Sequence, residues 1–294
     1  MTPPFEQPPK KTTAAKCRAD DALHQAGLCP SPAQAQALIM AGQVFLGDHR
    51  IDKAGQPIHP SDYPRLRLAT PSNATPFVSR GGLKLQAALA QFNICVKNRI
   101  CLDVGASTGG FTDCLLQHDA AQVLSVDVGY NQLAWSLRQH PRVVSLERCH
   151  INRVAPESIL ADAQAPISFA CIDVSFISLL RVLPSVVALL APEAHLIALL
   201  KPQFEYKEAM DASAQKTFRG VVKQPEERLQ IARHIICQIH QSIPPWHCAA
   251  AMPSPISGAN GNREALLYLT KAKTSQKEPP DTESLALACF EPFA

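Results

Sequence analysis

The chain has 294 residues, 46% of them hydrophobic, which suffices for one large domain with a well-filled core and one small domain. Its ten cysteines include no C-x-x-C pair and lie in apolar surroundings, so the sequence excludes a disulfide scaffold. The net charge of +3 excludes a uniformly basic chain, and no signal peptide or membrane span is recognisable, so we expect a cytoplasmic protein.

Positive charge is concentrated at the start of the chain. Residues 1–80 hold nine Lys/Arg against six Asp/Glu, whereas the remaining residues hold 19 of each kind. This excess favours an acidic partner for the N-terminal part, although an ordinary solvated surface gives the same pattern. Residues 1–16 are rich in Pro, Thr and Lys and lack apolar periodicity, which predicts a disordered tail.

A compact module is predicted at 17–70. Within it, Ser31 and Pro32 predict the start of a helix, because serine caps helix N-termini and proline favours the first turn. Alternating residues then predict short strands at 43–46 and 65–68.

The pattern S-x-x-x-A-x-x-L-I-x-x-G-x-V that begins at Ser31 resembles the S4 RNA-binding module. That resemblance implies a small α+β domain with a basic surface for structured RNA. We expect the RNA contacts to come from Arg18, Arg50, Arg65, Arg67 and Arg80. The turn at 46–50 departs from the family pattern, which usually has an asparagine there, and a small α/β appendage without a ligand is the alternative.

A second, larger domain is predicted at 79–272, after a proline-containing linker at 71–78 and before a C-terminal tail at 273–294. Strands and helices alternate in it, which predicts a doubly wound, mostly parallel α/β sheet. The predicted strands are 99–104, 122–127, 142–146, 167–173, 195–200, 246–252 and 264–270. The predicted helices include 111–118, 131–139, 179–190 and 225–241.

A glycine-bearing turn at 105–111 follows an apolar strand and precedes a helix, which predicts a nucleotide-type cradle. Asp127 ends the next strand, where an acid suits hydrogen bonding to a ribose diol. The spacing G-x-x-x-G-G differs from the dinucleotide G-x-G-x-x-G and resembles motif I of S-adenosylmethionine-dependent methyltransferases, so a NAD enzyme is the weaker alternative. The resemblance implies S-adenosylmethionine as cofactor, held by Asp103, Gly105, Ala106, Ser107, Thr108, Gly109, Gly110, Phe111, Asp127, Val128 and Asp173.

Two lysines and two acids are expected on one rim of the sheet, namely Lys84, Asp173, Lys201 and Glu264. They resemble the Lys-Asp-Lys-Glu tetrad of FtsJ-type ribose 2′-O-methyltransferases. A ribose hydroxyl is a weak acid, and a lysine can remove its proton only if a neighbouring cation and partial burial lower the lysine pKa. The resemblance implies Lys201 as general base, Lys84 as a second cation that steers the hydroxyl, and the two acids as orienting groups. For each residue taken alone, a surface ion pair is the alternative.

Most of the chain is similar to the TlyA family, which joins an S4 module to an FtsJ-like domain. The similar segments are 77–85, 101–116, 126–135, 173–179, 200–205 and 261–264. The resemblance implies a Rossmann-like class I methyltransferase fold and 2′-O-methylation of cytidine in ribosomal RNA or ribosomal subunits. Two other functions stay open: an RNA-binding protein without catalysis, and a membrane-active haemolysin, a name that family members often carry.

Three features fall outside this resemblance or depart from it. Residues 149–152 differ from the family pattern, and 206–222 predict either a substrate loop or a disordered segment. His234, Cys237 and His240 can meet on one helix face but lack a fourth ligand, so we expect no metal. We also expect a monomer that does not contact a membrane.

Overall fold

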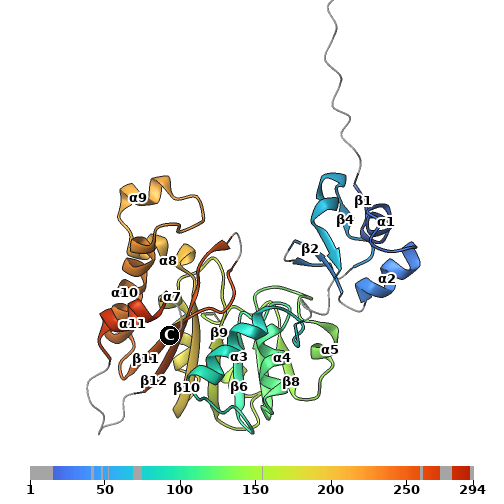
Figure 1. Ribbon diagram of the computed structural model, residues 1–294. Coiled ribbons are helices and arrows are strands. Elements are labelled where there is room, and N and C mark those ends of the chain that lie inside the picture. The colour runs from blue at the N-terminus through green and yellow to red at the C-terminus, as the bar shows by residue number, and fades with distance from the viewer. Residues whose placement is uncertain are drawn as a thin grey trace, which may run out of the picture. The chain divides into compact units, whose positions relative to one another are not determined.

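The computed structural model describes residues 16–40, 43–47, 49–51, 53–68, 75–153, 155–258, 261–271 and 280–291. The chain divides into two compact units, residues 1–74 and 75–294 (Figure 1). Each unit has its own hydrophobic core. The predicted N-terminal tail lies outside the described residues except for Lys16, and so does the predicted linker over 71–74.

The first unit is a small α+β fold with short strands. Its elements are β1 (Cys17–Arg18), α1 (Ala19–Gln25), α2 (Pro32–Met40), β2 (Val44–Leu46), β3 (His49–Arg50), β4 (Pro57–Ile58), the 3-10 helix η1 (Pro60–Arg65) and β5 (Leu66–Leu68). Antiparallel β2 lies between β3 and β5, and β1 pairs with β4. The predicted helix start after Ser31 is confirmed, because the Ser31 hydroxyl accepts a 3.2 Å hydrogen bond from the Gln34 amide. The helices pack on the strands through Leu23, Ile39 and Val44.

The second unit is built on one seven-stranded sheet. Its strands are β6 (Ile100–Val104), β7 (Gln122–Val126), β8 (Val143–Leu146), β9 (Ile167–Ile172), β10 (Leu190–Leu200), β11 (Trp246–Pro253) and β12 (Ala265–Lys271). Their order is β11-β12-β10-β9-β6-β7-β8, parallel from β8 to β10 and antiparallel beyond. The predicted mostly parallel sheet is therefore confirmed. The strand order reverses between β6 and β9, where open α/β sheets bind their ligands.

Helices cover both faces of this sheet (Figure 1). They are α3 (Gly81–Gln91), α4 (Gly110–Gln117), α5 (Trp135–Arg138), α6 (Pro156–Leu160), α7 (Leu179–Val187), α8 (Pro202–Ala209), α9 (Ala212–Thr217), α10 (Pro225–Ser242) and α11 (Thr282–Ala288). Successive residues of a strand point to opposite faces, so Leu102 and Leu124 belong to the core with α7, α10 and α11. Their neighbours Cys101 and Val123 belong to the core with α3 and α4. Burial on both faces explains why the strands are apolar almost throughout.

Three predicted boundaries in the second unit were wrong. The helix predicted at 131–139 is reduced to α5, because Asn131 has a φ of 58° and left-handed backbone cannot continue a helix. The fifth strand begins at Leu190, which pairs with Ile167 ahead of a bulge. The preceding helix, predicted to reach 190, therefore ends at Val187.

The C-terminal tail predicted from residue 273 also needs correction. It contains α11, which packs against α10 and β11. Leu285, Ala286 and Cys289 are buried there in the core. A helix of seven residues presents too little periodicity to be recognised from the sequence, and only its packing on the sheet side reveals it.

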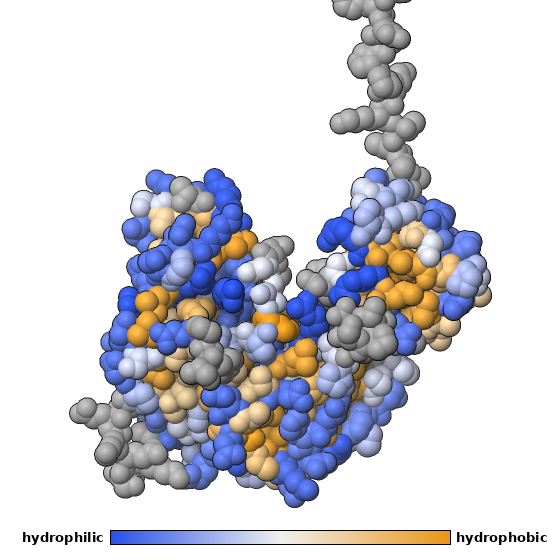
Figure 2. All heavy atoms as spheres, viewed as in Figure 1, coloured by the Kyte–Doolittle hydropathy of each residue, from blue (hydrophilic) through white to orange (hydrophobic). Residues whose placement is uncertain are grey.

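The segment predicted as a substrate loop or disordered, 206–222, continues from α8 into α9. In Figure 2 the surface over these two helices is mostly hydrophilic. The described residues contain no helix that is long and apolar enough to cross a membrane.

Candidate active site

Two glycines shape the loop between β6 and α4. Gly105 has a φ of +86°, and a Cβ there would lie 2.4 Å from the carbonyl oxygen of Asp173. Gly109 has a φ of +97°, and a Cβ there would lie 2.3 Å from Cδ1 of Leu137. A larger residue at either position would strain the backbone and overlap its neighbours. Gly105 thus lets the loop lie directly against the end of β9, and Gly109 lets it lie against α5.

Asp103 lies beneath this loop. Its carboxylate is fully buried in β6, and its Oδ2 accepts a 2.6 Å hydrogen bond from the Thr112 hydroxyl on α4. Burial raises the pKa of Asp103 to about 7. Two cavities lie at the carboxyl ends of β6 and β9, and among the predicted cofactor residues Asp103 and Gly109 line neither of them. Asp103 instead joins the strand to the helix that follows it.

Asp127 ties the loop to the neighbouring strand end. Its Oδ2 accepts a 2.8 Å hydrogen bond from the Ser107 amide, and its Oδ1 accepts a 2.6 Å bond from the Gly129 amide. Each carboxylate oxygen can accept more than one hydrogen bond. Asp127 can therefore hold the loop and still accept bonds from the hydroxyls of a ribose.

Two cavities meet at the carboxyl ends of β6 and β9. The larger has a volume of about 810 Å³ and is lined by Gly105, Ser107, Asp127, Val128 and Asp173, among other residues. The smaller has a volume of about 250 Å³. Its lining includes Lys84, Gly105, Ala106, Ser107, Thr108, Gly110, Phe111, Asp173 and Lys201. The larger volume lies in the range of small-molecule sites, so the cradle has room for a nucleoside-sized cofactor.

The four residues of the predicted tetrad form two ion pairs. Lys84 Nζ lies 2.6 Å from Glu264 Oε2, and Lys201 Nζ lies 2.5 Å from Asp173 Oδ1. Lys201 also donates a 3.0 Å hydrogen bond to the Ser175 hydroxyl, a contact that the sequence did not indicate. Burying charges costs free energy unless they are paired and hydrogen-bonded. Two largely buried ion pairs beside one loop therefore indicate a site where the charges serve a function.

Two residues outside the predicted set belong to the segment around Glu264. A Cβ at Gly258 would lie only 2.1 Å from Glu264 Oε1, so glycine leaves the room that this carboxylate occupies. Asn262 is buried, donates a 3.1 Å hydrogen bond to the Gly220 carbonyl and accepts a 3.3 Å bond from the Val222 amide. The Asn-x-Glu spacing was visible in the sequence, whereas the contact of Gly258 with Glu264 was not.

Residues 77–271 match the family model described as FtsJ-like methyltransferase, and residues 17–62 match the model described as S4 domain. The chain belongs to the FtsJ-like methyltransferase family. The resemblance predicted from the sequence is confirmed, and the second unit is an FtsJ-like domain preceded by an S4 domain.

Three relatives are similar over most of their length. The 16S/23S rRNA (cytidine-2′-O)-methyltransferase TlyA of Mycobacterium tuberculosis is 40% identical over 87% of this chain and 90% of that protein. Hemolysin A of Brachyspira hyodysenteriae is 36% identical over 85% of this chain and 98% of that protein. A solved structure from Streptococcus thermophilus, provisionally named a hemolysin, is 35% identical with a TM-score of 0.64. The alignment with that structure covers 92% of this chain and 94% of the other chain.

An exposed aromatic side chain stands at the mouth of the FtsJ-like site. Phe176 follows β9, has a φ of 64° and is 91% exposed. Its ring centroid lies 4.9 Å from that of Phe204, and Lys201 Nζ lies 5.8 Å from the Phe204 ring. Both rings line the larger cavity. The sequence showed an aromatic residue shortly after Asp173, but its exposure is visible only in the structure.

The arginines predicted to contact RNA make contacts within the protein. In the S4 domain, Arg18 pairs with Asp20 at 2.8 Å, and Arg65 pairs with Asp62 at 3.3 Å. Arg67 donates a 2.9 Å hydrogen bond to the Gly47 carbonyl and lies over the Phe45 ring. Arg50 and Arg80 also take part in contacts, and Arg80 belongs to the FtsJ-like domain, next to α3. The side chains of Arg18 and Arg65 are 56% and 61% exposed, so they can still reach a partner.

Proposed function

We propose that the protein is an S-adenosylmethionine-dependent methyltransferase that modifies the ribose 2′-hydroxyl of a cytidine in ribosomal RNA. One observation carries this proposal: Lys84 and Lys201, each paired with a carboxylate, line the same cavity as the glycine loop. The relatives' names support ribosomal RNA as substrate and cytidine as target. This substrate also favours a cytoplasmic location.

Lys201 is the proposed general base. Asp173 and Ser175 hold its Nζ at 2.5 and 3.0 Å, which fixes the direction of the amine. Lys201 first releases its own proton to water and then takes the proton of the 2′-hydroxyl as the oxygen bonds to the methyl carbon. When bound, S-adenosylmethionine would supply that methyl from an activated sulfonium group, and the broken S–C bond would leave a neutral thioether. Positioning accounts for much of the acceleration in such a displacement.

Lys84 is the proposed second cation. Its Nζ is fixed on Glu264, so its charge stays in one place at the cavity wall. A fixed cation stabilises negative charge that develops on an attacking oxygen and draws that oxygen into line. Asp173 and Glu264 orient the two lysines and keep the site close to neutral.

The cofactor is proposed to lie along the glycine loop. Asp127 accepts hydrogen bonds from the ribose hydroxyls, with Val128 beside it in the larger cavity. Residues 105–108, Gly110 and Phe111 form the wall near the methionine part, next to the two lysines. The short contact between Gly105 and Asp173 leaves no room for a side chain between loop and strand end.

The S4 domain is proposed to dock the enzyme on structured RNA. Arg18, Arg50, Arg65 and Arg67 are its proposed contacts, with Arg80 contributing from the FtsJ-like domain. Arginine suits this task because its planar guanidinium binds phosphate oxygens in pairs. We propose that the enzyme acts as a monomer.

The direct test is methyl transfer from labelled S-adenosylmethionine to ribosomal subunits, with methylated nucleotides mapped in the RNA. The variants are Lys201→Met and the control Lys97→Met, whose exposed lysine forms a surface pair with Asp119 at 3.6 Å. We expect 2′-O-methylcytidine with the wild type and the control, and none above background with Lys201→Met. Equal transfer by Lys201→Met, or label on a base instead of a ribose, contradicts the proposal.

A membrane-active protein is the second candidate, because two relatives carry hemolysin names. Leakage of dye from liposomes by the pure protein, measured beside methyl transfer, separates the two functions. Leakage without methyl transfer favours the second candidate.

A further inference from the structure

A buried carboxylate, Glu205, lies close in sequence to the proposed base but has no role in the steps above. It belongs to α8, which begins directly after Lys201. Its residue exposure is 1%, and no cation pairs with it among the described residues. Burying a carboxylate costs free energy, so a position that keeps one calls for an explanation.

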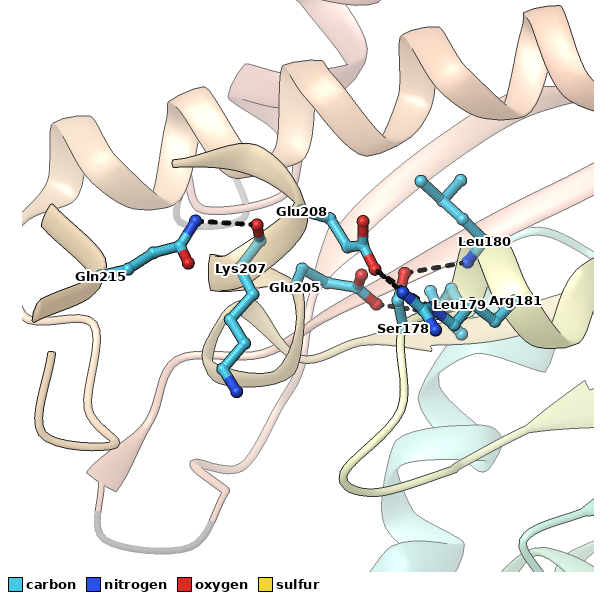
Figure 3. A network of polar contacts seen from close by, with 8 residues as sticks. All are labelled: Ser178, Leu179, Leu180, Arg181, Glu205, Lys207, Glu208 and Gln215. Atoms are coloured by element: carbon cyan, nitrogen blue, oxygen red, sulfur yellow. Dashed lines mark hydrogen bonds and ion pairs between the residues drawn. The ribbon is translucent and has the colours of Figure 1, made fainter. Parts of the chain in front are cut away.

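Glu205 contacts the start of a different helix. Its Oε1 accepts a 2.8 Å hydrogen bond from the amide of Leu179, the first residue of α7. Figure 3 shows Glu205 pointing from α8 toward this helix start. Burial raises the pKa of Glu205 to about 7, while the Leu179 amide and the Ser178 hydroxyl act in the opposite direction.

Glu205 and Ser178 satisfy different amides at the start of α7. The Ser178 hydroxyl accepts a 3.2 Å hydrogen bond from the Leu180 amide, whereas Glu205 accepts the bond from Leu179, whose N–H also lacks a partner within the helix. A second contact, the pair of Glu208 and Arg181 at 3.0 Å, joins the same two helices, but the Arg181 side chain is 69% exposed. The Glu205 contact is distinct because it joins these two segments, which leave the sheet from neighbouring strands, in the interior of the protein.

Those two segments carry the two halves of one ion pair. The segment after β9 places Asp173 and Ser175 ahead of α7, and the segment after β10 places Lys201 ahead of α8. Glu205 follows Lys201 by four residues, and Leu179 follows Asp173 by six. The two segments are therefore joined at two points, by the ion pair of Lys201 and Asp173 and, further along, by the hydrogen bond between Glu205 and Leu179.

We propose that Glu205 is a positioning residue that holds α8 against the start of α7 and thereby keeps Lys201 on Asp173 and Ser175. The expected effect of Glu205 on the rate rests on the proposed function. Its expected effect on the distance between Lys201 and Asp173 does not. A base displaced by even about 1 Å loses much of its effectiveness, so the distant contact acts on catalysis through alignment.

Three variants separate this role from a general contribution to folding. Glu205→Met keeps the volume but cannot accept the Leu179 hydrogen bond, and Glu205→Gln keeps an accepting oxygen without a charge. Asp281→Asn is the matched control, because Asp281 accepts a 3.1 Å hydrogen bond from the Ser284 amide at the start of α11. Folding of each variant is checked by thermal unfolding and by its binding of S-adenosylmethionine.

The rate measurement compares kcat and KM for ribosomal RNA. We expect Glu205→Met to lower kcat by about 10- to 100-fold with little change in KM, as misalignment of a bound reactant does. Glu205→Gln is expected to stay within about threefold of the wild type, because it preserves the geometry. Asp281→Asn is expected to match the wild type. Loss of activity in Glu205→Gln equal to that in Glu205→Met contradicts the proposal, as does an unchanged kcat in Glu205→Met.

Crystal structures of Glu205→Met and of the wild type test the geometry without an assay. We expect the distance between Lys201 Nζ and Asp173 Oδ1 to lengthen beyond ion-pair range in the variant. If the wild type transfers no methyl group, the proposed function fails, and this distance still decides the positioning role. A pair that stays intact in Glu205→Met overturns the role whatever the activity.

Discussion

The two ion pairs of the candidate site differ in how much water reaches them. The two lysines are equally buried, with Lys84 10% and Lys201 11% exposed, but their acids differ, since Glu264 is 3% and Asp173 is 22% exposed. A base must exchange protons with solvent and substrate, and a fixed cation need not. The more exposed Asp173 makes its pair the better candidate for proton transfer, and the buried Glu264 makes its pair the better candidate for a fixed charge, although both consist of a lysine and an acid.

The largest expected effect is on kcat, and it comes from the pair of Lys201 and Asp173. Lys201→Met should lower kcat by about 10²- to 10⁴-fold, the usual contribution of a general base. The unfolding free energy should fall less than on breaking the other pair, because the Asp173 side chain that is left behind is 22% exposed, against 3% for Glu264. Single-turnover methyl transfer and urea unfolding measure the two quantities. A large loss of stability with the rate intact would reverse the roles of the two pairs.

Breaking the pair of Lys84 and Glu264 should mainly lower the free energy of unfolding. Lys84→Met leaves the Glu264 carboxylate buried without its cation, which costs about 3–5 kcal/mol of unfolding free energy. The double variant Lys84→Met/Glu264→Leu removes both charges and should recover most of that loss. Urea unfolding of the single and double variants measures the coupling. Equal destabilisation by the two variants would show that the buried charge is not the cause.

A smaller loss of unfolding free energy should follow when Glu264 is crowded but keeps its pair with Lys84. In Gly258→Ala the new methyl would lie 2.1 Å from Glu264 Oε1, so the carboxylate must move. We expect a loss of about 1–3 kcal/mol in unfolding free energy, typical of overpacking, together with a lower kcat. Gly220→Ala is the control, because no atom lies within 4 Å of a Cβ there, although its φ of +86° adds backbone strain. A kcat lowered equally in both variants would show that the crowding of Glu264 is not the cause.

A pH dependence is the last expected effect, and it comes from a buried carboxyl that has no cation among the described residues. The pKa of Glu205 is about 7 in the folded chain against an ordinary 4.5. Between these values the folded chain keeps the proton that the unfolded chain has lost, so stability falls as the pH rises through this window and then levels off. Glu205→Gln removes this contribution. Its Tm should exceed that of the wild type at pH 8, and the difference should shrink toward pH 5. A constant difference in Tm would assign it to packing.

Sequence reasoning succeeded where one segment contains the whole signal. Apolar runs ending in Asp103 or Asp127 predicted buried parallel strands, because such strands are covered on both faces and need no alternation. The glycine loop could likewise be located, since left-handed backbone after a strand requires glycine. The tetrad was identified by resemblance, and the structure brings its members together in pairs.

Sequence reasoning failed where the signal lies in contacts between segments that are distant along the chain. Ser175 meets Lys201 across 26 positions, and Glu205 meets Leu179 across 26 as well. The room that Gly258 leaves for Glu264 is a matter of shape, which the residue type alone does not disclose. Likewise α11 is defined by its packing against α10 and β11. Such features depend on tertiary packing, which overrides local propensity.

The hydrogen bonds that Asp127 accepts from Ser107 and Gly129 have a thermodynamic consequence for ligand binding. They order the walls of the cradle during folding, before any cofactor arrives. A cofactor entering a preorganised cradle loses little affinity to the ordering of the chain, so more of its contact energy remains as affinity. Releasing both amides through Asp127→Ala would shift that ordering to the moment of binding, and calorimetry would register it as a less favourable entropy.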